Sequence, residues 1–155
     1  MTMHLGSLAW KQERRRIELA QDRGSSDAVK SFAQRMVAQH SRANDQLKQV
    51  AAQSSISLPS DISPRDQSTY DKLAKLSGSD FDRAYARDMV NDHVADLAEF
   101  QKEANAGRNA EIKDFALQSL PMLREHLNQA REMLKAVSAS SARRTSSGRG
   151  VRSAR

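Results

Sequence analysis

The sequence predicts an all-α protein, a bundle of long helices, and three observations favour this class. Aromatic residues make up only 5% of the 155 residues, and there are only six Gly and three Pro, too few for the turns and strands of a sheet. Apolar residues recur at spacings of three and four through most of the chain. One long link near the middle separates two pairs of helices. That connectivity is typical of a ferritin-like four-helix bundle with a short extra helix in its crossover.

Two long helices are expected in the first part of the chain. The first spans about residues 5–22, and Gly24 ends it because glycine suits the last turn of a helix. The run Arg14 to Arg16 interrupts its apolar stripe and is interpreted as surface charge. Ser25 or Ser26 caps the second helix, which continues to about residue 54. Its apolar positions lie on one face: Val29, Phe32, Ala33, Met36, Val37, Leu47, Val50 and Ala51.

The second part of the chain begins after the long link at residues 54–64. Pro64 starts a short helix to about residue 76, since proline costs no hydrogen bond at the first helical position. Ser79 caps a long helix over residues 80–106, and Gly107 ends it. A last helix spans about residues 109–137. Pro121 lies inside it and is expected to kink the helix or split it near Leu120.

The last segment has a different composition. Residues 138–155 consist mostly of Ser, Arg and Gly and contain no acid, so they cannot bury enough apolar surface to order themselves. We therefore divide the chain into a ferritin-like helical bundle, residues 1–137, and a disordered Arg/Ser-rich tail, residues 138–155. The tail carries five of the six net positive charges, which leaves the bundle nearly neutral, and the tail is interpreted as solvated. No nucleic-acid partner is assigned, and contact with anionic surfaces or a homo-oligomer is left open.

Several functional classes are excluded. The chain has no cysteine, so it forms no disulfide, thiolate metal site or cysteine nucleophile. No apolar run reaches the roughly 18 residues of a membrane-spanning helix, and the start lacks the pattern of a secretory signal. Glycine-rich phosphate loops and the motifs of serine hydrolases and zinc proteases are also absent. No catalytic residue is assigned, which favours a binding protein over an enzyme.

An internal repeat is the most specific local feature. The pattern aromatic-Ala-x-x-Met-Val-x-x-His occurs at residues 32–40 and again at residues 85–93, and a degenerate third copy covers residues 122–126. Residues four apart lie on one face of a helix, so each thioether is expected near its own imidazole. The three pairs are Met36 with His40, Met89 with His93, and Met122 with His126.

These pairs suggest a metal site. Imidazole and thioether are soft ligands that suit copper(I) better than magnesium or calcium, and a carboxylate lies one turn after the second histidine. The alternative is a structural or interaction protein, since methionine usually fills cores. A di-iron redox enzyme is disfavoured because the chain contains no Glu-x-x-His. The predicted ligands of a copper or zinc ion are His40, His93, His126, Met36, Met89, Met122 and Asp96.

The same positions also carry a family resemblance. Residues 29–40, the run Gly78-x-x-Phe81-Asp-x-x-Tyr85 and the run Leu120-Pro121-x-x-x-x-His126-Leu resemble the bacterial family called domain of unknown function 4142. The resemblance covers about residues 13–134. It implies a ferritin-like fold, a location in the periplasm or cell envelope, and the three histidines as characteristic positions, but no established activity. The chain lacks the signal peptide usual in that family, so a cytoplasmic location also stays open.

Overall fold

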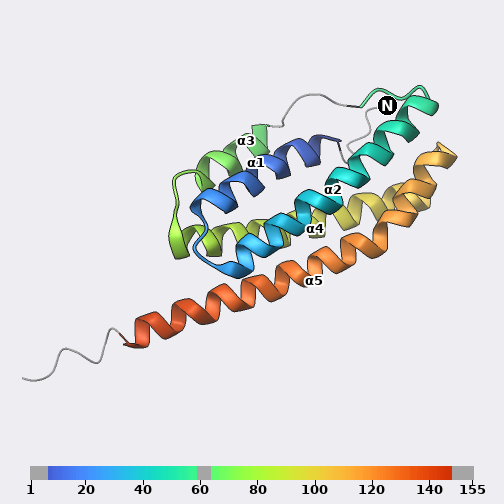
Figure 1. The fold of residues 1–155 in the computed structure, drawn as a ribbon. Coiled ribbons are helices and arrows are strands. Elements are labelled where there is room, and N and C mark those ends of the chain that lie inside the picture. Colours follow the sequence, from blue (N-terminus) through green and yellow to red (C-terminus); the bar gives the residue numbers. More distant parts are fainter. Residues whose placement is uncertain (1–6, 59–63, 148–155) are drawn as a thin grey trace, which may run out of the picture.

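The computed structural model describes residues 7–58 and 64–147, which form five helices and no strand (Figure 1). The predicted all-α bundle is confirmed, whereas its ferritin-like character stays a prediction. No described helix has both the length and the apolar content needed to cross a membrane. The helices are α1 (Ser7–Arg23), α2 (Asp27–Gln53), α3 (Pro64–Leu73), α4 (Gly78–Ala106) and α5 (Ala110–Ser147).

Two helical hairpins build the bundle. α1 packs against α2, and α4 packs along α5, while the short α3 contacts α1 and α4. Figure 1 shows that the chain passes from the end of α2 through α3 before it enters α4. As a result α2 and α4 run in the same direction and α5 runs in the opposite one. This arrangement determines which turns of the three long helices lie at the same level.

The helix starts show how the hairpins are connected. Ser26 caps α2 by accepting a hydrogen bond from the Val29 amide at 3.4 Å. Ser25 donates its hydroxyl instead to Asp82 Oδ2 at 2.6 Å, which ties the α1–α2 link to the start of α4. The prediction that Ser79 caps α4 is wrong. The helix begins at Gly78, whose φ of +59° lies in the left-handed region that glycine adopts without strain.

Helix α5 is longer than predicted and is not split. It is continuous through Pro121, where buried side chains of Leu120 and Leu123 anchor the turns on both sides, so the predicted split near Leu120 is wrong and the kink stays a prediction. It also continues beyond Val137 to Ser147, so this part of the predicted tail is helical. Extending an existing helix requires no new nucleation, and the described side chains after Val137 are all exposed. Residues 148–155 lie outside the described residues.

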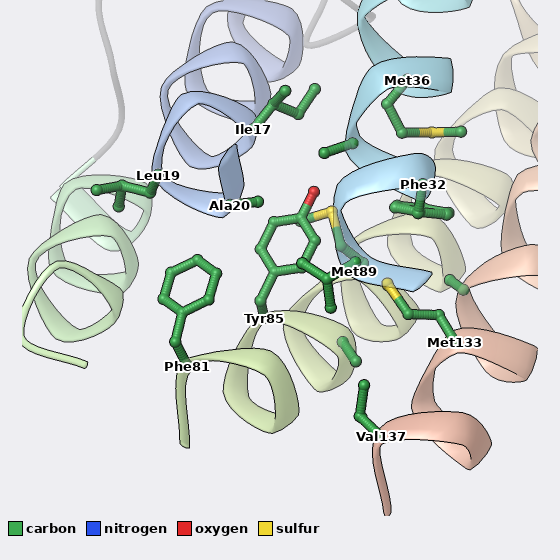
Figure 2. Packing of buried hydrophobic residues seen from close by; sticks show 14 of the residues in the cluster. Ile17, Leu19, Ala20, Phe32, Met36, Phe81, Tyr85, Met89, Met133 and Val137 are labelled. Carbon is green, nitrogen blue, oxygen red and sulfur yellow. The ribbon is translucent and has the colours of Figure 1, made fainter. Parts of the chain in front are cut away.

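Buried apolar side chains form two clusters along the bundle. The first cluster draws on all five helices, and Figure 2 shows many of its side chains meeting between α1, α2, α4 and α5. The second cluster lies toward the ends of α2 and α4 and the start of α5. The three histidines of the repeat separate them along each long helix. The first cluster includes Ile17, Phe32, Met36, Phe81, Tyr85, Met89, Ala130 and Met133, and the second includes Leu47, Phe100, Ile112, Phe115, Leu120 and Leu123.

Candidate metal centre

The three histidines of the repeat converge between the two apolar clusters. His40 comes from α2, His93 from α4 and His126 from α5, and one nitrogen of each lies within 4.8 Å of the others. Their ring centroids are 4.8, 5.5 and 5.8 Å apart. His93 and His126 are buried and His40 is partly buried. The repeat predicts that His40 and His93 meet, because the same motif on two parallel helices places their histidines at the same height along the bundle.

One ring nitrogen of each histidine is held by a hydrogen-bond acceptor. His40 Nδ1 donates to the Glu13 carboxylate at 2.6 Å, and His93 Nδ1 donates to the backbone carbonyl of Met89 at 2.8 Å. His126 Nε2 donates to the side-chain oxygen of Gln39. These acceptors assign the tautomers, because a carbonyl or carboxylate oxygen requires a proton on the nitrogen. The same arrangement is characteristic of histidines that bind metals, whose other nitrogen nearly always donates to such an acceptor.

The other nitrogen of each ring has no such acceptor. His40 Nε2 and His126 Nδ1 are 2.9 Å apart and share one hydrogen bond. His93 Nε2 is buried and has no hydrogen-bond partner in the part of the chain that the structure describes. Since the Nδ1 of His93 carries the proton, this Nε2 presents a lone pair. Leaving such a group buried and unpaired costs about 1–3 kcal/mol, which calls for a functional reason.

The charges of the site follow from burial and pairing. Burial favours the neutral form of Glu13, but the charge and hydrogen bond of His40 outweigh it and lower the pKa of Glu13 from 4.5 to about 2. Burial likewise lowers the pKa of His40, and Glu13 reverses the effect so that the pKa is raised. Burial and then the charge of His40 lower the pKa of His126 to about 3. An ionised Glu13 therefore faces a protonated His40, which donates to a neutral His126.

Arg16, one turn after Glu13, closes the α1 side of the site. Its guanidinium is 3% exposed and binds Asp88 at 2.6 Å and Asp92 at 2.9 Å, both on α4. The interpretation of residues 14–16 as surface charge is therefore wrong for Arg16. The helical period places it on the same inward face as Ile17. Burial would lower the pKa of Arg16, but the two aspartates outweigh it and raise the pKa.

The structure separates the three predicted thioethers. Met36 and Met89 are fully buried in the first apolar cluster, on one side of the histidines. Met122 lies on the other side, where it lines a cavity together with His40 and Asp96. The carboxyl of Asp96 is not among the groups that converge with the three histidines in the described residues. Burial and the nearby Asp92 raise the pKa of Asp96 well above its ordinary value.

The predicted ligands do not include the two side-chain acceptors of the site, Glu13 and Gln39. Glu13 had a signal, since it lies four residues before Ile17 and shares that residue's buried face on α1. The sequence contains no signal for Gln39, because this residue directly precedes His40 and is exposed on α2. Its contact with His126 depends on how α2 packs against α5.

Comparison with known proteins supports the predicted resemblance. A family model described as Domain of unknown function (DUF4142) matches residues 9–133, a range that contains α1 through most of α5 and all three converging histidines. Neither a curated protein nor a solved structure matches the chain. The chain therefore belongs to the DUF4142 family.

Proposed function

We propose that this protein binds a transition metal ion, zinc or copper, through His40, His93 and His126. The observation that carries the proposal is that the two nitrogens of each imidazole ring have different environments. One nitrogen of each ring is held by an acceptor, the three rings converge, and His93 Nε2 is left unpaired in the described ranges. Three imidazoles are a common ligand set for zinc and also suit copper.

Metal binding would require only a small rearrangement. Zinc–imidazole bonds of about 2.0–2.1 Å place ligand nitrogens about 3.4 Å apart. Nitrogens within 4.8 Å of one another would therefore close by at most about 1.4 Å, and the 2.9 Å pair of His40 and His126 would open by about 0.5 Å. The ion would displace the proton between His40 and His126. Glu13 would then hold His40 in position through Nδ1, as carboxylates do for zinc-bound histidines.

The packing of the methionines favours a nitrogen ligand set over paired thioethers. Met36 and Met89 lie among Phe32 and Tyr85 in the first apolar cluster, where flexible thioethers fill space. This arrangement supports zinc or a histidine-bound copper ion more than copper(I) held by Met/His pairs. The proposed role is sequestration of the metal in the cell envelope or under stress, and only the envelope location follows from the family resemblance.

A structural role is the second candidate, and a specific observation favours it. Hydrogen bonds link Glu13, His40, His126 and Gln39 in one chain across α1, α2 and α5, which satisfies two of the histidines without an ion. On this hypothesis the histidines hold the helices together. It gives no account of the unpaired nitrogen of His93.

The substitution His93→Leu separates the two hypotheses. Chelator-treated protein is titrated with Zn²⁺ and with Cu²⁺ against a chromophoric competitor, and its unfolding by urea is measured without metal. The proposal expects wild-type protein to bind one ion with a Kd below about 1 µM. His93→Leu should weaken binding at least about 100-fold and change the unfolding free energy by less than about 1 kcal/mol, since leucine removes an unpaired buried nitrogen.

The exposed Asn91 on α4 provides the matched control, and Asn91→Ala should leave both measurements unchanged. Wild-type protein that binds neither ion at micromolar concentration contradicts the proposal. A large loss of stability in His93→Leu together with no metal binding in the wild type would support the structural role.

A further inference from the structure

We propose that the ion held by the three histidines keeps one exchangeable coordination position, which opens into an adjacent cavity and takes a ligand of two or three heavy atoms. The inference rests on the proposed metal site and goes beyond it by naming the class of ligand. Sites with three protein ligands commonly leave the fourth position for water or substrate, whereas purely structural zinc sites are closed by four.

The cavity lies one helical turn beyond the histidines. His40 forms part of its wall, and the other walls come from the following turns of the three helices that supply the histidines. Asn44 follows His40 on α2, Asp96 follows His93 on α4, and Met122 precedes His126 on the antiparallel α5. One turn of an α-helix rises about 5.4 Å, so the cavity is the layer next to the ion.

The opposite face of the histidine layer is closed. One turn in the other direction lie Met36, Met89 and Ala130, all of which are 0% exposed within the first apolar cluster. The α1 side is occupied by the buried Glu13 and Arg16. Of these three sides, the cavity alone leaves space for a ligand that reaches the ion.

The size and lining of the cavity set the class of ligand. Its volume of about 40 Å³ corresponds to roughly three water molecules, at about 10–15 Å³ each. Leu47, Phe100 and Phe115 make much of the wall apolar, which disfavours bulky or strongly hydrated ions. Asn44 is 7% exposed, and its Oδ1 has no hydrogen-bond partner among the described residues, so its amide remains for a small ligand or its water.

Cobalt(II) and azide test the inference. Co²⁺ takes histidine sites like those of zinc and reports its coordination in the visible spectrum. Azide has three heavy atoms and fits the cavity, whereas benzoate does not. Adding azide to the cobalt-loaded wild type should change the spectrum saturably, and benzoate should not. The substitution Ala43→Leu fills the cavity and should weaken azide binding at least about tenfold while cobalt affinity stays within about threefold.

Ala38→Leu is the matched control, because Ala38 is exposed on the same helix and should leave azide binding unchanged. If Ala43→Leu does not fold, Asn44→Leu fills the same cavity and should give the same loss. Wild-type protein that binds no cobalt overturns the metal site and this inference together. Cobalt binding without any response to azide overturns the inference alone, as does equal azide binding by the cavity-filled variants.

Discussion

The contact between Glu13 and His40 offers the most direct test of the electrostatics of the site. The two side chains meet at 2.6 Å, and the carboxylate is only 1% exposed. The substitution Glu13→Gln keeps the size of the side chain and removes its charge. His40 then loses the anion that raises its pKa, and it must either remain buried as an unpaired cation or become neutral.

The expected cost follows from the pKa of Glu13. Lowering this pKa from 4.5 to about 2 corresponds to about 3 kcal/mol in favour of the folded state, since one unit is about 1.4 kcal/mol. The raised pKa of His40 reports the same interaction, so the energy is counted once. Glu13 stabilises the metal-free fold above its unfolded pKa of 4.5, and this contribution is lost as the pH falls toward 2. The contribution of His40 is complete below 6.5 and is lost as the pH rises through its raised pKa.

Urea unfolding with a chelator present, measured from pH 3 to pH 9, gives the required free energies. The contribution of the Glu13–His40 pair should be largest between about pH 4.5 and 6.5 and should decrease on both sides. Glu13→Gln should therefore lose about 3 kcal/mol relative to the wild type in that window, and the difference should shrink outside it. Glu18→Gln is the control, because Glu18 pairs with Arg14 at 3.2 Å with both side chains 64% exposed, and should cost less than about 0.5 kcal/mol. A Glu13→Gln protein within about 1 kcal/mol of the wild type across the window refutes the reasoning.

Three further predictions concern the ion and the core. Zinc must displace a proton from His40, whose pKa is raised, so the apparent zinc affinity should increase with pH up to that pKa. Calorimetry in two buffers of different ionisation enthalpy should detect the released proton. A zinc affinity that does not change with pH contradicts this prediction. Met36→Leu combined with Met89→Leu should cost under about 1.5 kcal/mol and leave zinc affinity within about threefold, whereas a tenfold loss would identify a thioether ligand. Arg16→Met should cost about 3–5 kcal/mol in urea unfolding, because it leaves two aspartates without their cation. The exposed Arg14→Met is its control, and equal effects of the two substitutions would contradict a special role for the buried guanidinium.

The parts of the fold that were predicted correctly depend on local signals. Proline at position 64 and glycine at position 107 mark helix boundaries, because the effect of each residue on the backbone is confined to one turn. The Met-x-x-x-His spacing is equally local, because it places each histidine on the same face of its own helix as the methionine four residues before it. His126 was predicted from the weakest copy of the repeat, and the structure places it beside the other two.

The partners of the histidines could not be predicted in the same way. Gln39 reaches His126 only because α2 and α5 pack together, and no spacing within α2 encodes that contact. The burial of Arg16 was not predicted, because a run of three arginines is typical of a solvent-exposed helix face. A stronger clue was available on α4, where Asp88 and Asp92 share the inward face of Tyr85 and require a buried cation from another helix.

The direction of the helices changes what the repeated Met-x-x-x-His pattern means. In two parallel helices, α2 and α4, the methionine falls on the same side of the histidine layer, and both side chains join the first apolar cluster. In the antiparallel α5 the same spacing places Met122 on the opposite side, in the cavity wall with Asp96. Three copies of one motif therefore cannot supply three equivalent pairs of ligands. They produce a layer of imidazoles with one apolar, closed face and one face that opens into a cavity. The reactivity of a bound ion is accordingly to be sought on the cavity face, which the side chains of Asn44 and Asp96 line.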